Sequence, residues 1–97
     1  MIRLHWTPEA IADRDVIYDY IEADNPRAAL ALDELISEKA NRLVDHPGIG
    51  RPGRVSGTRE LVAHQNYILI YDITVDSIRV LRVLHAARQW PPQASGN

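Results

Sequence analysis

The sequence has no cysteine among its 97 residues, so it can form neither a disulfide framework nor a thiolate site. A zinc site built on cysteine is excluded, and only histidine and carboxylate side chains remain as metal ligands. No run of about 18 apolar residues occurs, although a membrane-spanning helix needs one. The N-terminal residues 1–6 also lack the long apolar core of a secretory signal. We therefore expect a cytoplasmic protein with no metal and no cofactor.

Length and charge narrow the class of protein further. A chain of 97 residues forms one small domain and leaves no room for a second catalytic domain. The formal net charge of −2 argues against a general nucleic-acid binder, because such domains are usually basic. Residues 1–47 carry five basic and ten acidic side chains, whereas residues 48–97 carry six arginines and three acidic side chains. A GC-rich genome would explain the number of arginines equally well, but it explains their clustering less well.

The N-terminal half is expected to contain one strand and two helices. Apolar and polar residues alternate over residues 2–6, which is the pattern of a half-buried strand. Thr7 and Pro8 then supply a helix N-cap and a proline at the first helical position. Asn25 and Pro26 repeat this signal, so the second helix follows the first almost without a loop. The two helices are predicted to form a hairpin.

Each predicted helix carries apolar residues at helical spacing. In the first helix Ala10, Ile17 and Ile21 form a stripe within an apolar arc that is broad enough to contact both a sheet and the second helix. Tyr18 and Tyr20 in this helix are candidates for recognition, but packing is the commoner role of aromatic residues at such spacing. The stripe of the second helix consists of Ala28, Leu32, Leu35, Ile36, Ala40 and Leu43.

The C-terminal half is expected to be a loop followed by strands. Glycine and proline predict an irregular loop from Pro47 onward, with Arg51 and Arg54 at its tip. This loop is either an ordinary solvated connection or a flexible arginine loop at the rim of a binding surface. Strand-type runs separated by short turns then predict strands at residues 58–64, 67–73 and 78–85.

The predicted order of elements is strand, helix, helix, strand, strand, strand. This order indicates an α+β fold, in which a small, mostly antiparallel sheet is packed on one face by the helical hairpin. We take residues 77–90 as the segment around which the chain is organised, because its strand-type run predicts an interior strand that is apolar on both faces. His85 and Arg88 follow that strand, so we expect them at the mouth of the fold, where charged side chains can meet a partner.

Four segments together resemble the RelE/ParE superfamily of bacterial toxins. They are residues 6–10 (WTPEA), 50–62 (GRPGRVSGTRELV), 66–71 (NYILIY) and 82–91 (RVLHAARQWP). The resemblance covers residues 1–91, which we take as one toxin domain, followed by a flexible tail at residues 92–97. It implies the toxin of a type II toxin–antitoxin pair, a growth inhibitor bound by a cognate antitoxin. Through that antitoxin alone, the toxin would also reach operator DNA.

The superfamily contains two activities, and the first is ribosome-dependent cleavage of mRNA by RelE-like members. Metal-free cleavage needs an activated 2′-hydroxyl, cations at the phosphate and a proton for the leaving oxygen. By resemblance the candidate catalytic residues are Arg59, His85 and Arg88. Two positions depart from the RelE pattern, since Ile68 stands where RelE has an arginine and no tyrosine follows Trp90. A histidine at a strand end is also more often structural than catalytic.

The second activity, inhibition of DNA gyrase by ParE-like members, asks for a binding surface and no chemistry, and we favour it. Arginine and tryptophan are enriched in interface hot spots. The target-binding candidates are Arg51, Arg54, Arg59, Arg82, Arg88 and Trp90. The structural alternatives are that Trp90 closes the core beside Trp6, and that Arg79 or Arg82 pairs with Asp72, Asp76 or Glu60.

The resemblance also implies a surface for the antitoxin. We expect an amphipathic helix or an extended strand of the antitoxin to lie on the hairpin and sheet. The candidate contacts are Ile11, Tyr18 and Leu30. A third hypothesis is that the chain is a decayed toxin, which only binds its antitoxin and takes part in regulation.

Overall fold

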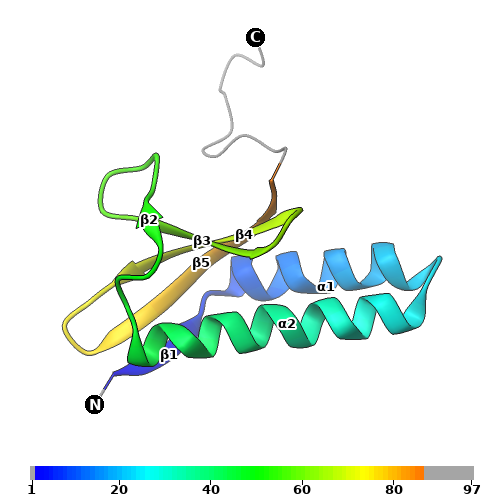
Figure 1. Ribbon diagram of the computed structural model, residues 1–97, viewed down its shortest axis with the longest axis horizontal. Coiled ribbons are helices and arrows are strands. Elements are labelled where there is room, and N and C mark those ends of the chain that lie inside the picture. Colours follow the sequence, from blue (N-terminus) through cyan, green and yellow to red (C-terminus); the bar gives the residue numbers. More distant parts are fainter. Residues whose placement is uncertain (1, 87–97) are drawn as a thin grey trace, which may run out of the picture.

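The computed structural model describes residues 2–86, which form two helices and five strands. The helices are α1 (Pro8–Glu22) and α2 (Pro26–Asp45). The strands are β1 (Arg3–Trp6), β2 (Arg51–Pro52), β3 (Arg59–His64), β4 (Tyr67–Ile73) and β5 (Ser77–His85). The predicted α+β fold is confirmed: the antiparallel helical hairpin covers one face of a single sheet (Figure 1).

Both helices begin at the residues that the sequence indicated. The Thr7 hydroxyl oxygen accepts a hydrogen bond from the backbone N–H of Ala10 at 3.1 Å. The side-chain oxygen of Asn25 does the same for the N–H of Ala28, also at 3.1 Å. Each cap satisfies a backbone donor that the first turn of a helix leaves without a partner, and the proline that follows has no N–H to satisfy.

The sheet has the strand order β1-β5-β4-β3-β2, so β5 is an interior strand, as predicted. The pairs β2–β3, β3–β4 and β4–β5 are antiparallel, whereas β1 runs parallel to β5. The two-residue strand β2 corrects the prediction of an irregular loop from Pro47 onward. Arg51 and Pro52 can pair with β3 because a strand at the sheet edge needs few backbone hydrogen bonds and tolerates proline.

The register of β5 shifts once, and the shift decides which side chains face the helices. Tyr71 of β4 pairs with Val80, but the preceding residue Ile70 pairs with Arg82, so Leu81 is an extra residue in β5. A bulge of this kind reverses the alternation of side chains beyond it. It explains why Val80 and Val83, three positions apart, both face the helices, although the sequence pattern placed them on opposite faces.

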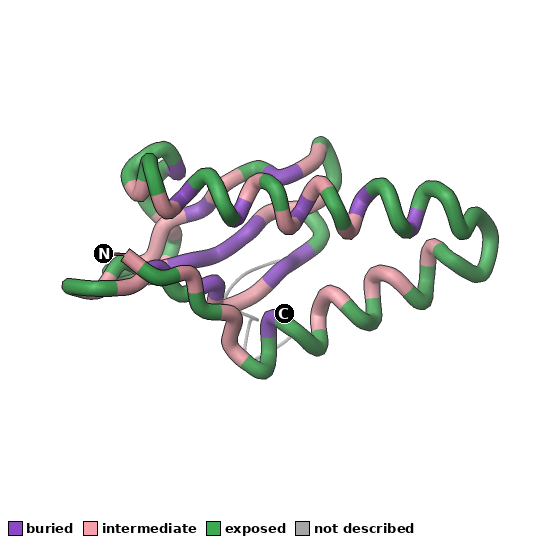
Figure 2. The backbone as a smooth tube through the Cα atoms, turned by 90° about the horizontal axis from the view of Figure 1, so that it is seen from below, coloured by how far each residue is buried: buried purple, intermediate pink, exposed green. Residues whose placement is uncertain are grey.

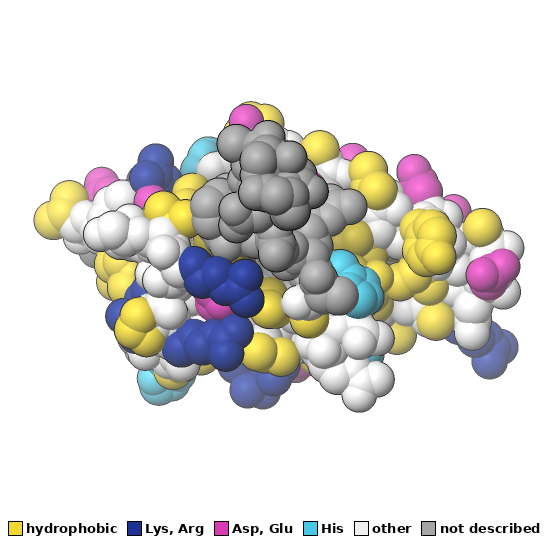
Figure 3. Space-filling view, turned by 90° about the horizontal axis from the view of Figure 1, so that it is seen from above, with side chains coloured by type: hydrophobic (Ala, Val, Ile, Leu, Met, Phe, Trp, Pro, Cys, Tyr) yellow, Lys and Arg dark blue, Asp and Glu magenta, His cyan; other side chains and the backbone are white. Residues whose placement is uncertain are grey.

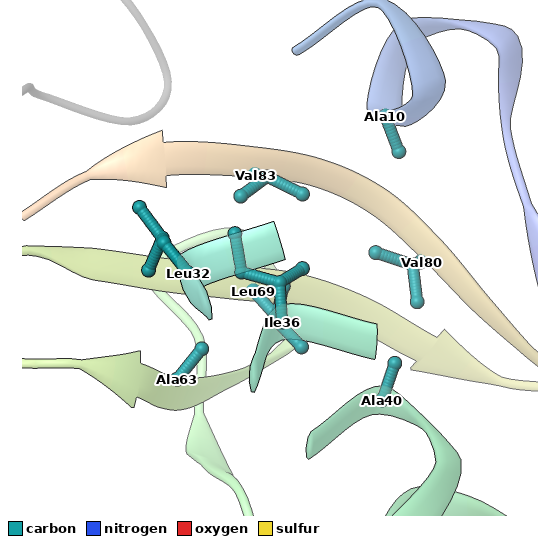
Figure 4. Close-up of a cluster of buried hydrophobic side chains, with 8 residues drawn as sticks. All are labelled: Ala10, Leu32, Ile36, Ala40, Ala63, Leu69, Val80 and Val83. Atoms are coloured by element: carbon teal, nitrogen blue, oxygen red, sulfur yellow. The ribbon is translucent and has the colours of Figure 1, made fainter. Parts of the chain in front are cut away.

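The core lies between the hairpin and the sheet. Figure 4 shows its largest cluster, in which Ile36 of α2 lies against Leu69, Val80 and Val83 of the sheet. Figure 2 looks onto the helices and shows that buried residues recur along α2, which lies in front of the strands in this view. The predicted stripe is largely correct, but Ala29 is buried and Ala28 is exposed. Within residues 2–86, no helix is long and apolar enough to cross a membrane.

Candidate functional site

The loop between α2 and β3, residues 47–58, is held to the sheet by a buried tyrosine. The Tyr71 hydroxyl donates to the carbonyl of Pro47 at 2.7 Å and accepts from the backbone N–H of Gly50 at 3.0 Å. Gly50 lies so close that a Cβ atom there would be 2.5 Å from this hydroxyl oxygen and 2.8 Å from the carbonyl oxygen of Glu60. These contacts require glycine at position 50, and they fix one end of the loop.

A buried carboxylate holds the middle of the same loop. Glu60 is only 6% exposed. Its Oε1 atom accepts hydrogen bonds from the guanidinium of Arg51, the shorter at 3.1 Å, and its Oε2 atom accepts from the backbone N–H of Arg54 at 3.4 Å. Tyr71 thus holds the start of the loop and Glu60 holds its middle. The loop is therefore an ordered arginine-bearing loop and not the flexible loop that was one of the two expectations.

Arg59 supports the loop as well. Its Nη2 atom donates to the carbonyl oxygens of Gly48 and Gly50. Cross-strand partners share a face of the sheet, and the partner of Arg59 is Tyr71, whose side chain is in the core under α2. The side chain of Arg59 therefore lies on the helix side of the sheet and binds the backbone of the loop.

His85 lies at the far end of the sheet, beside an apolar groove. Its ring meets the ring of Tyr67 edge to face, with the centroids 5.3 Å apart, and His64 flanks the same tyrosine at 6.2 Å. The groove has a volume of about 830 Å³ and runs between the end of the sheet and the distal half of the hairpin, which extends past the sheet in Figure 1. It is lined by Asp13, Val16, Ile17, Tyr20, Ile21, Ala28, Leu32, His64, Asn66, Tyr67, Val83, Leu84 and His85.

Arg59 and His85 are too far apart to act on one phosphate. Arg59 pairs with Tyr71, and His85 pairs with Tyr67, so the two side chains belong to opposite ends of β4. Four residues of strand span about 13 Å, before the distance across the intervening strand is added. Of the three candidate catalytic residues, Arg88 lies outside the described residues. Within residues 2–86, the structure therefore does not bring Arg59 and His85 together.

The other candidates for target binding occupy different places. Arg51 and Arg54 are exposed on the ordered loop. Arg82 is partly buried in an ion pair with Asp13 of α1, and its hydrogen bonds to this carboxylate raise the pKa of Arg82, although desolvation opposes the rise. We expected a partner on a neighbouring strand instead. Trp90 lies outside the described residues.

The structure describes Trp6 and the arginines of β5, so the structural alternatives for these side chains are tested in part. Trp6 is stacked under the guanidinium of Arg14, 4.5 Å from the ring centroid. Arg14 also pairs with Asp33 of α2 at 2.9 Å. Arg79 pairs with Asp72 across strands, as the structural alternative stated. Among the described residues, no group of three or more acidic or histidine side chains could hold a metal ion.

The candidates for antitoxin contact lie on the hairpin, but outside the groove. Ile11 and Leu30 are about half exposed, at 50% and 52%, and Tyr18 is intermediate. Val16 and Tyr20 line the groove and are 68% and 78% exposed. Val16 was not among the predicted contacts, whereas Tyr20 was a candidate for recognition for which packing was favoured. Packing was the wrong prediction for Tyr20. Its signal in the sequence was the unusually broad apolar arc of the first helix, because the sheet is too short to cover all of it.

Comparisons with known proteins agree with this geometry. Residues 4–90 match the model of the ParE toxin of the type II toxin–antitoxin system parDE. The chain belongs to the ParE toxin family. This ParE-family chain is 43% identical to Y4kP of Sinorhizobium fredii over 90 residues, which are 92% of this chain and 93% of that protein. The RelE/ParE resemblance is therefore confirmed, and the chain is the toxin of a type II toxin–antitoxin system.

Two solved structures extend the comparison to complexes. A chain of the chromosomal ParDE system of Pseudomonas aeruginosa aligns with this ParE-family toxin at a TM-score of 0.79 and 32% identity, covering 88% of this chain and 96% of that one. A chain of the toxin–antitoxin complex RelBE2 of Mycobacterium tuberculosis aligns at a TM-score of 0.63 and 26% identity, covering 87% and 96%. These neighbours support a cognate antitoxin as partner.

Proposed function

We propose that this toxin arrests growth by inhibiting DNA gyrase, and that it does not cleave mRNA itself. The observation that carries the proposal is the separation of Arg59 from His85. General acid–base catalysis needs both groups within hydrogen-bond reach of one substrate. Arg59 and His85 lie on strands either side of β4 and are offset by about 13 Å along it, so they do not meet that condition. Inhibition by binding makes no such demand.

The charge around the loop supports the same proposal. Stabilising the charge that develops on a phosphate requires cations that are not already neutralised. Arg51 is neutralised by the buried carboxylate of Glu60. No carboxylate neutralises Arg59 among residues 2–86, but its Nη2 atom already donates to the carbonyl oxygens of Gly48 and Gly50. Ile68, at the position where RelE has an arginine, is an apolar residue paired with Leu84. The match to the ParE model adds support, since gyrase is the target that the resemblance implies for ParE-like members.

We further propose that the groove beside Tyr67 receives an amphipathic helix of the antitoxin. Val16 and Tyr20 present apolar surface to solvent along one wall, while the buried residue Leu32 lies deeper. An exposed apolar groove with a few polar groups at its rim is the usual seat of such a helix. His64 and His85 at one end provide those polar groups.

Assays with purified proteins test the gyrase proposal. We expect the toxin to inhibit supercoiling by gyrase or to stabilise its cleavage complex, and the addition of the antitoxin encoded beside it should restore activity. A parallel reaction with ribosomes and mRNA serves as the control. Ribosome-dependent cutting without any effect on gyrase would replace this proposal by the RelE-like activity. No growth arrest at all, despite antitoxin binding, would support a decayed toxin.

A further inference from the structure

On the face of the sheet that points away from the helices, two arginines are each paired with a carboxylate that is less exposed than the guanidinium. We call this face the outer face. Arg51 pairs with Glu60, and the side chains are 61% and 6% exposed. Arg79 pairs with Asp72, with 46% and 17% exposed. In each pair the carboxylate is covered, and the guanidinium remains open to solvent.

The ladder of the sheet places these pairs on one face. Arg51 is the register partner of Glu60, and Glu60 is the partner of Ile70. Asp72 stands two positions after Ile70 in β4, so its side chain shares that face, and Arg79 is its partner. Figure 3 looks onto this side of the molecule and shows the dark blue Lys and Arg side chains gathered there.

The hydrogen bonds to the carboxylate fix the orientation of each guanidinium. Arg79 donates through Nε and Nη2 to the two oxygens of Asp72, the former at 2.9 Å, and this hydrogen bonding raises the pKa of Arg79. A guanidinium has further N–H donors on its opposite edge. Because the side chain is already ordered, a partner that uses those donors loses little rotamer entropy on binding.

The outer face is partly apolar next to the Arg51–Glu60 pair, on the side away from Asp72. Val62 of β3 is 52% exposed there and pairs with Ile68, which is intermediate. Arg54 borders the same surface, since it lines a small hollow with Ile68 and Leu84. The side chain of Arg54 is exposed and has no carboxylate partner among residues 2–86. Charged and apolar groups thus lie side by side on the outer face.

We propose that the outer face is the surface that binds the toxin's target, and that it recognises an acidic protein surface that also presents an apolar group for Val62. The inference rests on the proposed function and identifies gyrase as the protein concerned. A protein suits this face better than nucleic acid for two reasons. Glu60 and Asp72 offset most of the arginine charge, whereas phosphate binding needs a strongly positive surface. Exposed Val62 contributes nothing to a phosphate contact but fits an apolar pocket.

The arginines of the outer face do not line the antitoxin groove. The groove and the small hollow beside Arg54 share Leu84 and His85 at the end of β5, but neither Arg54 nor Arg79 reaches the groove. Substitutions of Arg54 and Arg79 should therefore leave docking of the antitoxin helix intact. Antitoxin binding becomes an internal control for the fold of each variant.

A charge-matched pair of variants tests the inference. The outer-face variant combines Arg54→Glu with Arg79→Gln, and the control combines Arg27→Glu with Arg42→Gln on the exposed surface of α2. Both change the net charge equally. We expect the outer-face variant to need about tenfold more protein for half-inhibition of gyrase, as the loss of a hot-spot contact would cause. The control should match the wild type, and rising salt should weaken wild-type inhibition.

The outcomes separate this inference from the proposed function. Equal inhibition of gyrase by the outer-face variant and the wild type, with both binding antitoxin, would overturn the inference and leave the proposed function standing. If the wild type does not inhibit gyrase, the proposed function fails. In that case, loss of ribosome-dependent mRNA cutting in the outer-face variant would show that the face binds RNA, and this would overturn the acidic protein partner.

Discussion

Asp13 of α1 and Arg82 of β5 form a two-pronged ion pair, with Nε–Oδ2 at 2.7 Å and Nη2–Oδ1 at 2.9 Å. The same carboxylate accepts the backbone N–H of Val83 at 2.9 Å. Close by, the Thr7 hydroxyl donates to the carbonyl of Leu81 at 2.9 Å. Strand β1 has already ended at this point of β5. Side chains of the helix and its cap therefore satisfy backbone groups that a neighbouring strand would otherwise satisfy.

We predict that Asp13→Ala lowers the free energy of unfolding by about 2 kcal/mol, because it leaves a partly buried guanidinium and a backbone N–H without their acceptor. Asp15→Ala, at an exposed position of the same helix, is the matched control and should change stability by less than about 0.5 kcal/mol. Urea unfolding followed by circular dichroism measures both. Equal stability of the two variants would contradict the role assigned to Asp13.

The contact of Asp13 also shows which features the sequence alone could not predict. Local signals such as Thr7–Pro8 and Asn25–Pro26 act within a few residues, so both helix starts were predictable. The contact between Asp13 and Arg82 joins positions 69 apart, and no periodicity reports it. The bulge at Leu81 and the parallel pairing of β1 with β5 are likewise tertiary. The run of strand-type residues at 78–85, apolar on both faces, predicted the strand, but not the change of face within it.

The candidate site was predictable by residue type more than by position. Arginines on the loop were expected, but their order comes from Glu60 and Tyr71, whose roles depend on the ladder of the sheet. Arg59 and His85 were grouped as one candidate catalytic set because both lie in family motifs. In the antiparallel register, Arg59 of β3 pairs with Tyr71 and His85 of β5 pairs with Tyr67, so the two residues lie on different sides of β4 and four residues apart along it. Spacing in sequence cannot reveal such a separation before the strands are paired.

Gly50 is predicted to tolerate no side chain. In Gly50→Ala the new Cβ would overlap both the Tyr71 hydroxyl and the carbonyl of Glu60, so the loop must shift at a cost of about 2 kcal/mol. Gly48→Ala is an ideal control two residues away, since a Cβ there has nothing within 4 Å. Thermal unfolding should show a lower Tm for the first variant only. A similar Tm for both would mean that the loop is looser than the hydrogen bonds indicate.

The hydroxyl of Tyr71 should matter by itself. Tyr71→Phe keeps the ring but leaves the N–H of Gly50 and the carbonyl of Pro47 without their partner, so we expect a loss of about 1–3 kcal/mol. Tyr20→Phe removes a hydroxyl from a side chain that is 78% exposed and should be neutral. Chemical denaturation compares the two, and cleavage by a protease within residues 47–58 should rise only in Tyr71→Phe.

The groove predicts where the antitoxin is sensitive to substitution. Val16→Glu places a charge on the apolar wall, and we expect antitoxin affinity to fall about tenfold or more, because the carboxylate must be desolvated without a partner. Val75→Glu is the control, since Val75 is 99% exposed at the turn between β4 and β5, far from the groove. Calorimetric titration with the antitoxin gives both values. Unchanged affinity in Val16→Glu would place the antitoxin helix elsewhere on the hairpin.

His85→Ala tests the choice between the two activities most directly. The ring packs against Tyr67 at the end of the sheet. Arg59 lies on the far side of β4 and is offset by four residues, about 13 Å, along the strand direction, so we expect the variant to arrest growth as strongly as the wild type. Circular dichroism and thermal unfolding verify that the variant is folded, because antitoxin binding could itself change when a groove residue is substituted. Expression without antitoxin, with growth followed over time, is the measurement. Loss of arrest in a folded His85→Ala protein, together with loss of mRNA cutting, would establish the histidine as catalytic and reject inhibition by binding alone.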